Sequence, residues 1–165
     1  MTGNTLLRAA KVALAAAAMA VAAPLFAQQH DATVGISRRH IYPDIASAQT
    51  DIQAAMAQAR KEHKRIILDF GGDWCGDCQV LYLYFHQAPN QAIVDKHFVV
   101  VPVNIGRMDA NLDIARRYGV PVKGVPALAV LDANGKVIVA QNLEFADMRH
   151  MDAQSVTEFL NKWKQ

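Results

Sequence analysis

The sequence lacks a clear excess of charge, because 17 lysines and arginines stand against 15 aspartates and glutamates. This balance gives no reason to expect a nucleic acid or an anionic membrane surface as a partner. Internal repeats are absent, and no low-complexity linker follows the N-terminal segment. Hydrophobic residues make up 52% of the chain, which excludes a disordered protein. At 165 residues, the chain has room for one domain and a targeting segment but not for two full domains.

The sequence also lacks a convincing membrane-spanning stretch. Its hydrophobic run over residues 12–26 is rich in alanine and shorter than the roughly 20 apolar residues that a bilayer requires. Arg8 and Lys11 precede this run, and Ala27 ends a cleavage site of small residues. We therefore predict that residues 1–27 are a signal peptide cleaved near Ala27, with an uncleaved anchor as the alternative. No cysteine lies at the cleavage region, so lipid attachment is not expected.

Cleavage would make the mature protein periplasmic or otherwise exported, and not membrane-spanning. Loss of Arg8 and Lys11 would leave 15 basic and 15 acidic residues, so the mature chain would be close to neutral. Cysteine is scarce, and the only two are Cys75 and Cys78. Two cysteines in an exported protein usually form a structural bridge, but this bridge would close a very short loop and constrain the unfolded chain little. A reversible redox couple is the better interpretation of the pair.

Hydrophobic periodicity divides the rest of the chain into alternating helices and strands. Residues 28–45 show no period, and we expect an exposed lead-in there, with room for one short strand near Val34. We expect helices over residues 44–63, 79–85, 90–96, 111–118 and from Ser155 onward, and strands over residues 65–70, 97–104, 127–131 and 136–140. The expected caps and turns are Thr50 with Gln53, Asn90, Ser155 with Glu158, and the hairpin turn Asn134-Gly135. This order predicts an α/β domain over residues 46–165, with a mixed sheet and helices on both faces.

The dithiol Cys75-Gly76-Asp77-Cys78 follows a predicted strand immediately and begins a predicted helix. This is the C-terminal edge of the sheet, where α/β folds place their chemistry. Unpaired backbone N–H groups and the helix dipole favour a thiolate at Cys75, so we expect Cys75 to attack a partner's disulfide. Cys78 lies one turn into the helix, and we expect it to attack the resulting mixed disulfide and release the partner. A redox-silent bridge or two inert buried thiols is the alternative.

Two segments resemble the thioredoxin superfamily. Residues 67–78, which include Asp69 and Trp74 before the dithiol, resemble its active-site segment. Residues 124–128, Gly-Val-Pro-Ala-Leu, resemble the segment that carries the family's cis-proline, and Asn134-Gly135 resembles the hairpin turn that follows. The resemblance extends from about Ala46 to the C-terminus. It implies the thioredoxin fold, a central mixed β-sheet flanked by helices on both faces, and activity as a thiol:disulfide oxidoreductase.

The resemblance also implies roles for two residues beside the cysteines. Asp69 matches the family's buried carboxylate, which accepts the proton of Cys78; a solvated aspartate at the strand end is the alternative. Pro126 matches the cis-proline, which would place the backbone of Val125 beside Cys75 to pair with a substrate strand. An ordinary trans proline in a turn is the alternative. No cofactor is implied beyond the redox-active disulfide.

The residues between and before the cysteines bear on substrate binding and on the direction of electron flow. Trp74, Gly76 and Asp77 are expected to complete the substrate-binding surface with Val125. Asp77 opposes a neighbouring thiolate by like-charge repulsion, which destabilises the reduced form and favours an electron donor. Asp73 is expected to add to this effect.

Three features depart from the family pattern. Gly71-Gly72 replaces bulkier residues before the tryptophan and predicts a more mobile loop. Pro102 falls within a predicted strand, at a place where thioredoxins commonly carry a lysine that tunes the buried acid; an edge strand or a bulge would accommodate it. Ala127 is smaller than the threonine that often follows the cis-proline.

Within the superfamily, the segment after the dithiol is similar to that of exported bacterial thioredoxin-like domains, such as the C-terminal domain of the interchange protein DsbD. Phe85, Asn90 and residues 93–101 carry this similarity. It implies a reductase of disulfide-containing exported proteins, recharged by an electron donor for which a membrane thiol:disulfide interchange protein is one candidate. The alternatives are a dithiol oxidase or isomerase, and a copper-binding or partner-binding module. Copper carriers on this fold usually space their cysteines more widely, and no motif surrounds any of the six histidines, so no metal site is expected.

Overall fold

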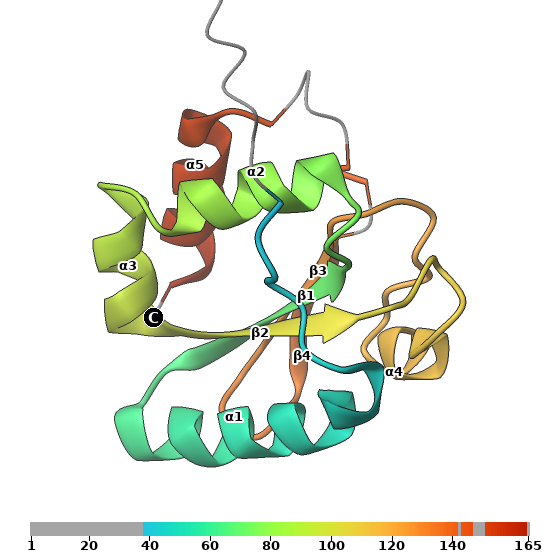
Figure 1. The fold of residues 1–165 in the computed structure, drawn as a ribbon. Helices are drawn as coiled ribbons and strands as arrows, with labels where there is room; N and C mark the ends of the chain where they lie inside the picture. The colour runs from blue at the N-terminus through green and yellow to red at the C-terminus, as the bar shows by residue number, and fades with distance from the viewer. Residues whose placement is uncertain (1–37, 142, 147–150, 165) are drawn as a thin grey trace, which may run out of the picture. The chain divides into compact units, whose positions relative to one another are not determined.

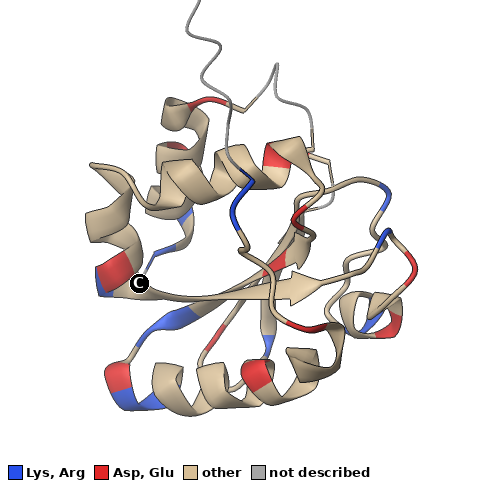
Figure 2. Ribbon diagram, viewed as in Figure 1, with Lys and Arg blue, Asp and Glu red and all other residues tan. Residues whose placement is uncertain are grey.

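The structure is a computed structural model that describes residues 38–141, 143–146 and 151–164 (Figure 1). The predicted signal peptide and the possible strand near Val34 lie outside these residues. In the described part of the chain, every helix is too short or too polar to cross a bilayer. Charged residues of both signs are scattered over the elements in the view of Figure 2, without a segment given over to one sign.

A four-stranded mixed sheet organises the domain, with the strand order β2-β1-β3-β4. The strands are β1 (Arg65–Gly71), β2 (Phe98–Asn104), β3 (Ala127–Leu131) and β4 (Val137–Gln141). β1 runs parallel to β2 and antiparallel to β3, and β3 and β4 form an antiparallel hairpin. The runs Ile66-Ile67-Leu68 and Val99-Val100-Val101 supply the β-branched and aliphatic side chains that a buried sheet favours. The predicted α/β class and mixed sheet are confirmed.

Helices cover both faces of the sheet, as predicted (Figure 1). After the 3₁₀ turn η1 (Ile45–Ser47) come α1 (Ala48–Glu62), α2 (Gly76–Phe85), α3 (Asn90–His97), α4 (Leu112–Arg117) and α5 (Ala153–Trp163). Side chains of β1 alternate between two cores. Leu68 packs in the cluster that contains residues of α1 and α4, whereas Ile67 packs in the cluster that contains residues of α2 and α5.

The proline within the second strand is accommodated because β2 is an edge strand, paired with β1 alone. An edge strand has one side without a partner strand, so a missing N–H removes less from the hydrogen-bond ladder there. Pro102 stands opposite Asp69 in the register of the two strands. Of the two alternatives left open by the sequence, an edge strand or a bulge, the edge strand is found.

The N-cap residues of the helices are the features that the sequence predicted least well. α1 begins at Ala48 with Ser47 as its N-cap, and the expected Thr50–Gln53 capping box is not formed. At α5 the capping box consists of Asp152 and Ser155, which exchange hydrogen bonds of 2.7 and 3.1 Å. Ser155 is thus the third helical residue and not the cap, because an aspartate three positions earlier caps the helix equally well.

The expected cap of α3 has another role. Pro89 is the N-cap residue of α3, and Asn90 is buried inside the domain. Its Oδ1 accepts a 2.6 Å hydrogen bond from the Thr157 hydroxyl of α5. The buried amide therefore connects two helices that cover the same face of the sheet.

Of the expected lead-in over residues 28–45, the structure describes residues 38–45. Most of these are exposed, as expected, but Tyr42 is completely buried. We call residues 39–43 the strap. Figure 1 shows it passing across the sheet near β2 before it enters η1. Hydrophobic periodicity could not detect it, since a strap held by side chains from elsewhere needs no period of its own.

Candidate active site

The two cysteines lie where β1 ends and α2 begins. Cys75 is the N-cap of α2 and Cys78 lies in its first turn, and they are joined by a disulfide with Cα atoms 5.2 Å apart. Cys75 is 5% exposed and Cys78 is fully buried. The backbone N–H of Cys78 donates a 3.0 Å hydrogen bond to the sulfur of Cys75. The same N–H and the helix N-terminus would stabilise a thiolate at Cys75 after reduction.

A second loop reaches the disulfide through the pairing of β3 with β1. The Val125–Pro126 peptide bond is cis, and β3 begins at the next residue. The carbonyl oxygen of Val125 lies 3.6 Å from the sulfur of Cys75. The backbone of Val125 therefore lies beside Cys75, the more exposed of the two cysteines.

Trp74, which precedes the dithiol, is fixed against a neighbouring loop. Its indole Nε1 donates a 2.5 Å hydrogen bond to the carbonyl oxygen of Gly106, and the guanidinium of Arg107 lies 5.8 Å from the ring centre. A Cβ at Gly72 would stand 2.6 Å from the indole nitrogen, which is too close for any side chain. The two glycines before the tryptophan are buried, and Gly72 allows this close packing.

Asp69 is buried within β1, the strand that leads to the disulfide, with only 3% of its surface exposed. In the sheet register it lies between Pro102 of β2 and Leu128 of β3, which provide no charge. Burial raises the pKa of Asp69 to about 7, partly opposed by a 3.0 Å hydrogen bond that the Tyr42 hydroxyl donates to Oδ2. Among the described residues, Oδ1 has no hydrogen-bond partner. The predicted burial of this carboxylate is therefore found, and the solvated alternative is wrong.

Gly71 brings the carboxylate and the buried sulfur together. It lies two residues beyond Asp69, so the two positions share one face of β1. A Cβ at Gly71 would lie 2.8 Å from the sulfur of Cys78 and closer still to the hydroxyl of Tyr42. Because Gly71 has no side chain, the Tyr42 hydroxyl and the sulfur of Cys78 can both lie close to the end of β1.

The strap that carries Tyr42 is held by the active-site loop and by α2, which the sequence did not reveal. Asp73 Oδ1 accepts backbone N–H bonds of 2.8 and 3.0 Å from Ile41 and Tyr42, and Oδ2 lies 2.7 Å from Nδ1 of His40. Burial tends to raise the pKa of Asp73, but the hydrogen bonds from Tyr42, Ile41 and His40 prevail and lower it. Asp73 therefore fixes the strap, a role that our expectation of like-charge repulsion overlooked. The only signal in the sequence was a pair of large apolar side chains, Ile41-Tyr42, in a segment expected to be exposed.

A second side chain completes the attachment of the strap. The amide of Gln79, which is 3% exposed, accepts a 3.0 Å bond from the backbone N–H of Arg39. It also donates a 2.9 Å bond to the carbonyl of the same residue. Gln79 follows Cys78 directly in α2, so the helix that contains the dithiol also binds the strap through these hydrogen bonds.

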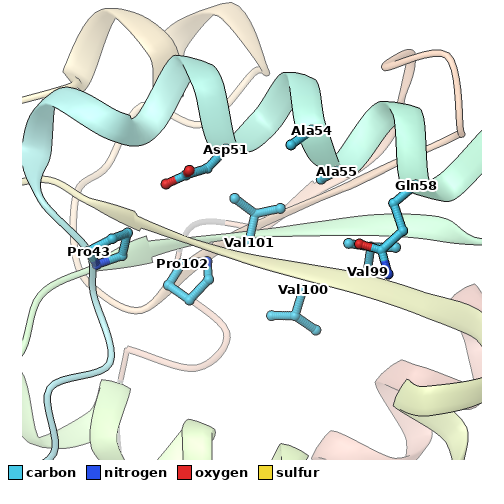
Figure 3. A pocket seen from close by; sticks show the side chains of 9 residues that line it. All are labelled: Pro43, Asp51, Ala54, Ala55, Gln58, Val99, Val100, Val101 and Pro102. Atoms are coloured by element: carbon cyan, nitrogen blue, oxygen red, sulfur yellow. The ribbon is translucent and has the colours of Figure 1, made fainter.

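One hollow of the described surface lies apart from the disulfide site. It lies between α1 and β2 (Figure 3) and is lined by Pro43, Asp51, Ala54, Ala55, Gln58 and Val99 to Pro102. Neither cysteine borders it. In the described part of the chain, no three His, Cys, Asp or Glu side chains are placed to hold a metal ion.

Comparisons with known proteins identify this arrangement. A family model described as thioredoxin-like matches residues 47–133. The thiol:disulfide interchange protein DsbD of Cronobacter sakazakii is 30% identical over 132 residues, which cover 80% of this chain and 22% of that protein. DsbD of Vibrio vulnificus is 31% identical over 88 residues, which cover 53% of this chain and 15% of that protein. The chain thus spans about a fifth or less of the length of these curated relatives.

Solved structures of other proteins are also similar to this chain. The crystal structure of a disulphide isomerase from Xylella fastidiosa matches with a TM-score of 0.70 and 35% identity, covering 75% of this chain and 96% of that chain. A thioredoxin from Thermus thermophilus matches with a TM-score of 0.50 and 18% identity, covering 67% of this chain and 81% of that chain. This second likeness supports the fold alone.

Gly71→Ala tests the close approach beneath the disulfide. The added methyl group would collide with Cys78 and Tyr42, and we expect it to lower the free energy of unfolding of the oxidised protein by about 1–3 kcal/mol. Gly76→Ala is the matched control, because nothing lies within 4 Å of a Cβ there. Urea unfolding measures both, and equal stabilities of the two variants would contradict the packing described above.

Asp69→Asn tests the burial of the carboxylate. The unfolded chain loses the Asp69 proton near pH 4, whereas the folded chain holds it to about pH 7, so this group makes stability fall as the pH rises through that interval. The loss is on the order of a few kcal/mol, and Asn removes it. Urea unfolding across this range should show the variant gaining stability relative to the wild type, while Asp95→Asn, at an exposed position of α3, keeps the wild-type profile. Parallel profiles for the wild type and Asp69→Asn would contradict a buried, protonated Asp69.

Proposed function

The chain belongs to the thioredoxin-like family and is a thiol:disulfide oxidoreductase, and on this premise we propose that it is exported and reduces disulfides of other exported proteins. The observation that carries the proposal is the disulfide at the N-terminus of α2, with the Val125 carbonyl 3.6 Å from Cys75 and the buried Asp69 behind it. Cys75 lies at the helix N-terminus and is the more exposed cysteine, whereas Cys78 is fully buried, so the two sulfurs are suited to two different steps of disulfide exchange.

In the first step, the thiolate of Cys75 attacks one sulfur of a substrate disulfide. A bond forms between Cys75 and that sulfur, the substrate S–S bond breaks, and the other substrate sulfur leaves with the electron pair. Cys75 is the attacking residue in this proposal because it is the more exposed sulfur and lies at the helix N-terminus.

In the second step, Cys78 gives its proton to the carboxylate of Asp69 and attacks the sulfur of Cys75. The Cys75–Cys78 disulfide forms, the bond to the substrate breaks, and the substrate sulfur leaves with the electron pair and takes up a proton. The protein has then lost two electrons and the substrate has gained them. An acid that titrates near neutral pH is suited to this exchange, since it can both accept and return a proton.

The loop at the cis-proline would bind the substrate. An extended substrate backbone could pair with the main chain at Val125, with Pro126 holding the loop beside Cys75. Trp74 and Gly76 would border the substrate on the dithiol side. Gly76 is exposed, and the space around it is open to a partner chain.

The direction of electron flow and the partners belong to the proposal as well. Asp77 lies in the first turn of α2, between the cysteines, where its charge opposes a thiolate and favours electron donation. As the electron donor we propose a membrane thiol:disulfide interchange protein. The similarity of this chain to part of proteins named thiol:disulfide interchange protein supports exchange with proteins of this kind. The similarity to a protein described as a disulphide isomerase makes isomerisation the second candidate function.

Cys78→Ala tests the order of attack. A mixed disulfide with Cys75 can then form but cannot be released, so we expect exported proteins to be captured through Cys75 and freed by added dithiothreitol. Cys75→Ala is the matched control and should capture far less, because the remaining sulfur is buried. Capture through Cys78 alone, or no capture by either variant, would contradict the proposal.

The redox state of the pair in its native compartment tests the direction. A reductase that is recharged by a donor should keep Cys75 and Cys78 mostly as thiols, which alkylation after acid quenching measures. A mostly oxidised pool would contradict the reductase and favour an oxidase. A mostly reduced pool that rescues scrambled ribonuclease as efficiently as it reduces insulin would favour the isomerase.

A further inference from the structure

We propose that Tyr42 is a positioning residue for the second step, because its hydroxyl holds the Asp69 carboxylate in the orientation that accepts the proton of Cys78. The inference rests on the proposed function, since it assigns Tyr42 a part in the step that releases the substrate. No helix or strand carries Tyr42, and it comes from a segment that precedes the first helix of the domain.

The two oxygens of the Asp69 carboxylate differ in their hydrogen bonding. Oδ2 accepts the 3.0 Å hydrogen bond from the Tyr42 hydroxyl, whereas Oδ1 has no hydrogen-bond partner among the described residues. The buried sulfur of Cys78 lies on the same side of β1, next to the Tyr42 hydroxyl above Gly71. One oxygen is therefore anchored and the other is left to exchange a proton.

The attachment of the strap indicates that Tyr42 does more than fill space. The strap is held by side chains of Asp73 and Gln79 and by Asn104, whose Nδ2 donates a 2.9 Å bond to the carbonyl of Pro43. Asp73 and Gln79 flank the two cysteines in the sequence. Tyr42 is thus fixed to the segment that carries the dithiol, and it keeps its place relative to Asp69 and Cys78 together.

The groups that face Asp69 come from four elements. The strap contributes Tyr42 and α2 contributes Cys78, whereas β2 and β3 contribute the uncharged neighbours Pro102 and Leu128. Burial, then the charge of Asp69 and its hydrogen bond, and then the charge of Asp73 raise the pKa of Tyr42 well above its usual value. The phenol therefore keeps its proton and remains a donor over the whole working range of pH.

The Tyr42 hydroxyl also changes the pH range over which the Asp69 carboxylate is deprotonated and can accept a proton. Its hydrogen bond favours the charged form and lowers the pKa of Asp69 against the larger effect of burial. Without it, more of the carboxyl groups would be protonated at neutral pH and unable to accept a proton from Cys78. The second step would then require a higher pH.

Tyr42→Phe keeps the ring and removes the donor, and the test uses the reduced full-length protein with dithiodipyridine as the substrate disulfide. The first release of pyridinethione reports the attack by Cys75, and the second, unimolecular release reports the attack by Cys78. We expect the pH midpoint of the second phase to rise by about one unit, with a several-fold slower rate at pH 7. The first phase should not change. Tyr118→Phe, at a buried ring of the same core cluster, is the matched control and should leave both phases unchanged.

A double variant separates positioning from structure. In an Asp69→Asn background, Tyr42→Phe should cause no further shift of the second phase, because the group through which it acts is gone. An unshifted second phase in Tyr42→Phe, or a shift that persists in the Asp69→Asn background, would overturn the inference. If Tyr42→Phe does not fold, Asp73→Asn, which loosens the strap and keeps the phenol, should shift the second phase in the same direction, and no shift would overturn the inference. Failure of the wild type to show a first phase would instead contradict the proposed function itself.

Discussion

The burial of the Asp69 carboxylate at the end of the central strand is the constraint on which the rest of the site depends. A carboxylate without water is unfavourable unless it is paired or protonated, and here it holds its proton to about pH 7. The sheet imposes this position, since Asp69 lies near the end of β1, which has a strand on each side. The Tyr42 phenol supplies one compensating hydrogen bond, and the glycine at the strand end leaves room for it.

The two sulfurs then lie in opposite electrostatic surroundings only one helical turn apart. Cys75 caps a helix N-terminus, where backbone N–H groups favour negative charge. Cys78 is fully buried on the side of β1 that carries Asp69, where a second negative charge would be costly. In the proposed mechanism a proton passes between these two groups. This asymmetry is the physical basis for the proposed order of attack, with Cys75 acting first and Cys78 second.

The sequence predicted well what depends on local pattern and poorly what depends on distant partners. The β-branched runs located β1 and β2, the Asn-Gly pair located the hairpin, and Pro102 indicated either an edge strand or a bulge. The caps of α3 and α5 were wrong because several residues near each helix start can serve, and the choice depends on tertiary contacts. The strap was missed because the partners of Tyr42 lie 27 and 31 residues away, at Asp69 and Asp73, and no periodicity records such contacts. The roles of the individual site residues remain predictions that the variants above examine.

The most direct test of the buried carboxylate is its own titration in the oxidised protein. Carbon-13 NMR of the aspartate side-chain carboxyls, with the Asp69 resonance assigned by its absence in Asp69→Asn, follows this group alone. The resonance should titrate with a midpoint at about pH 7. A midpoint near the ordinary value of about 4 would show that Asp69 is solvated or strongly paired, and it would contradict the account of the site.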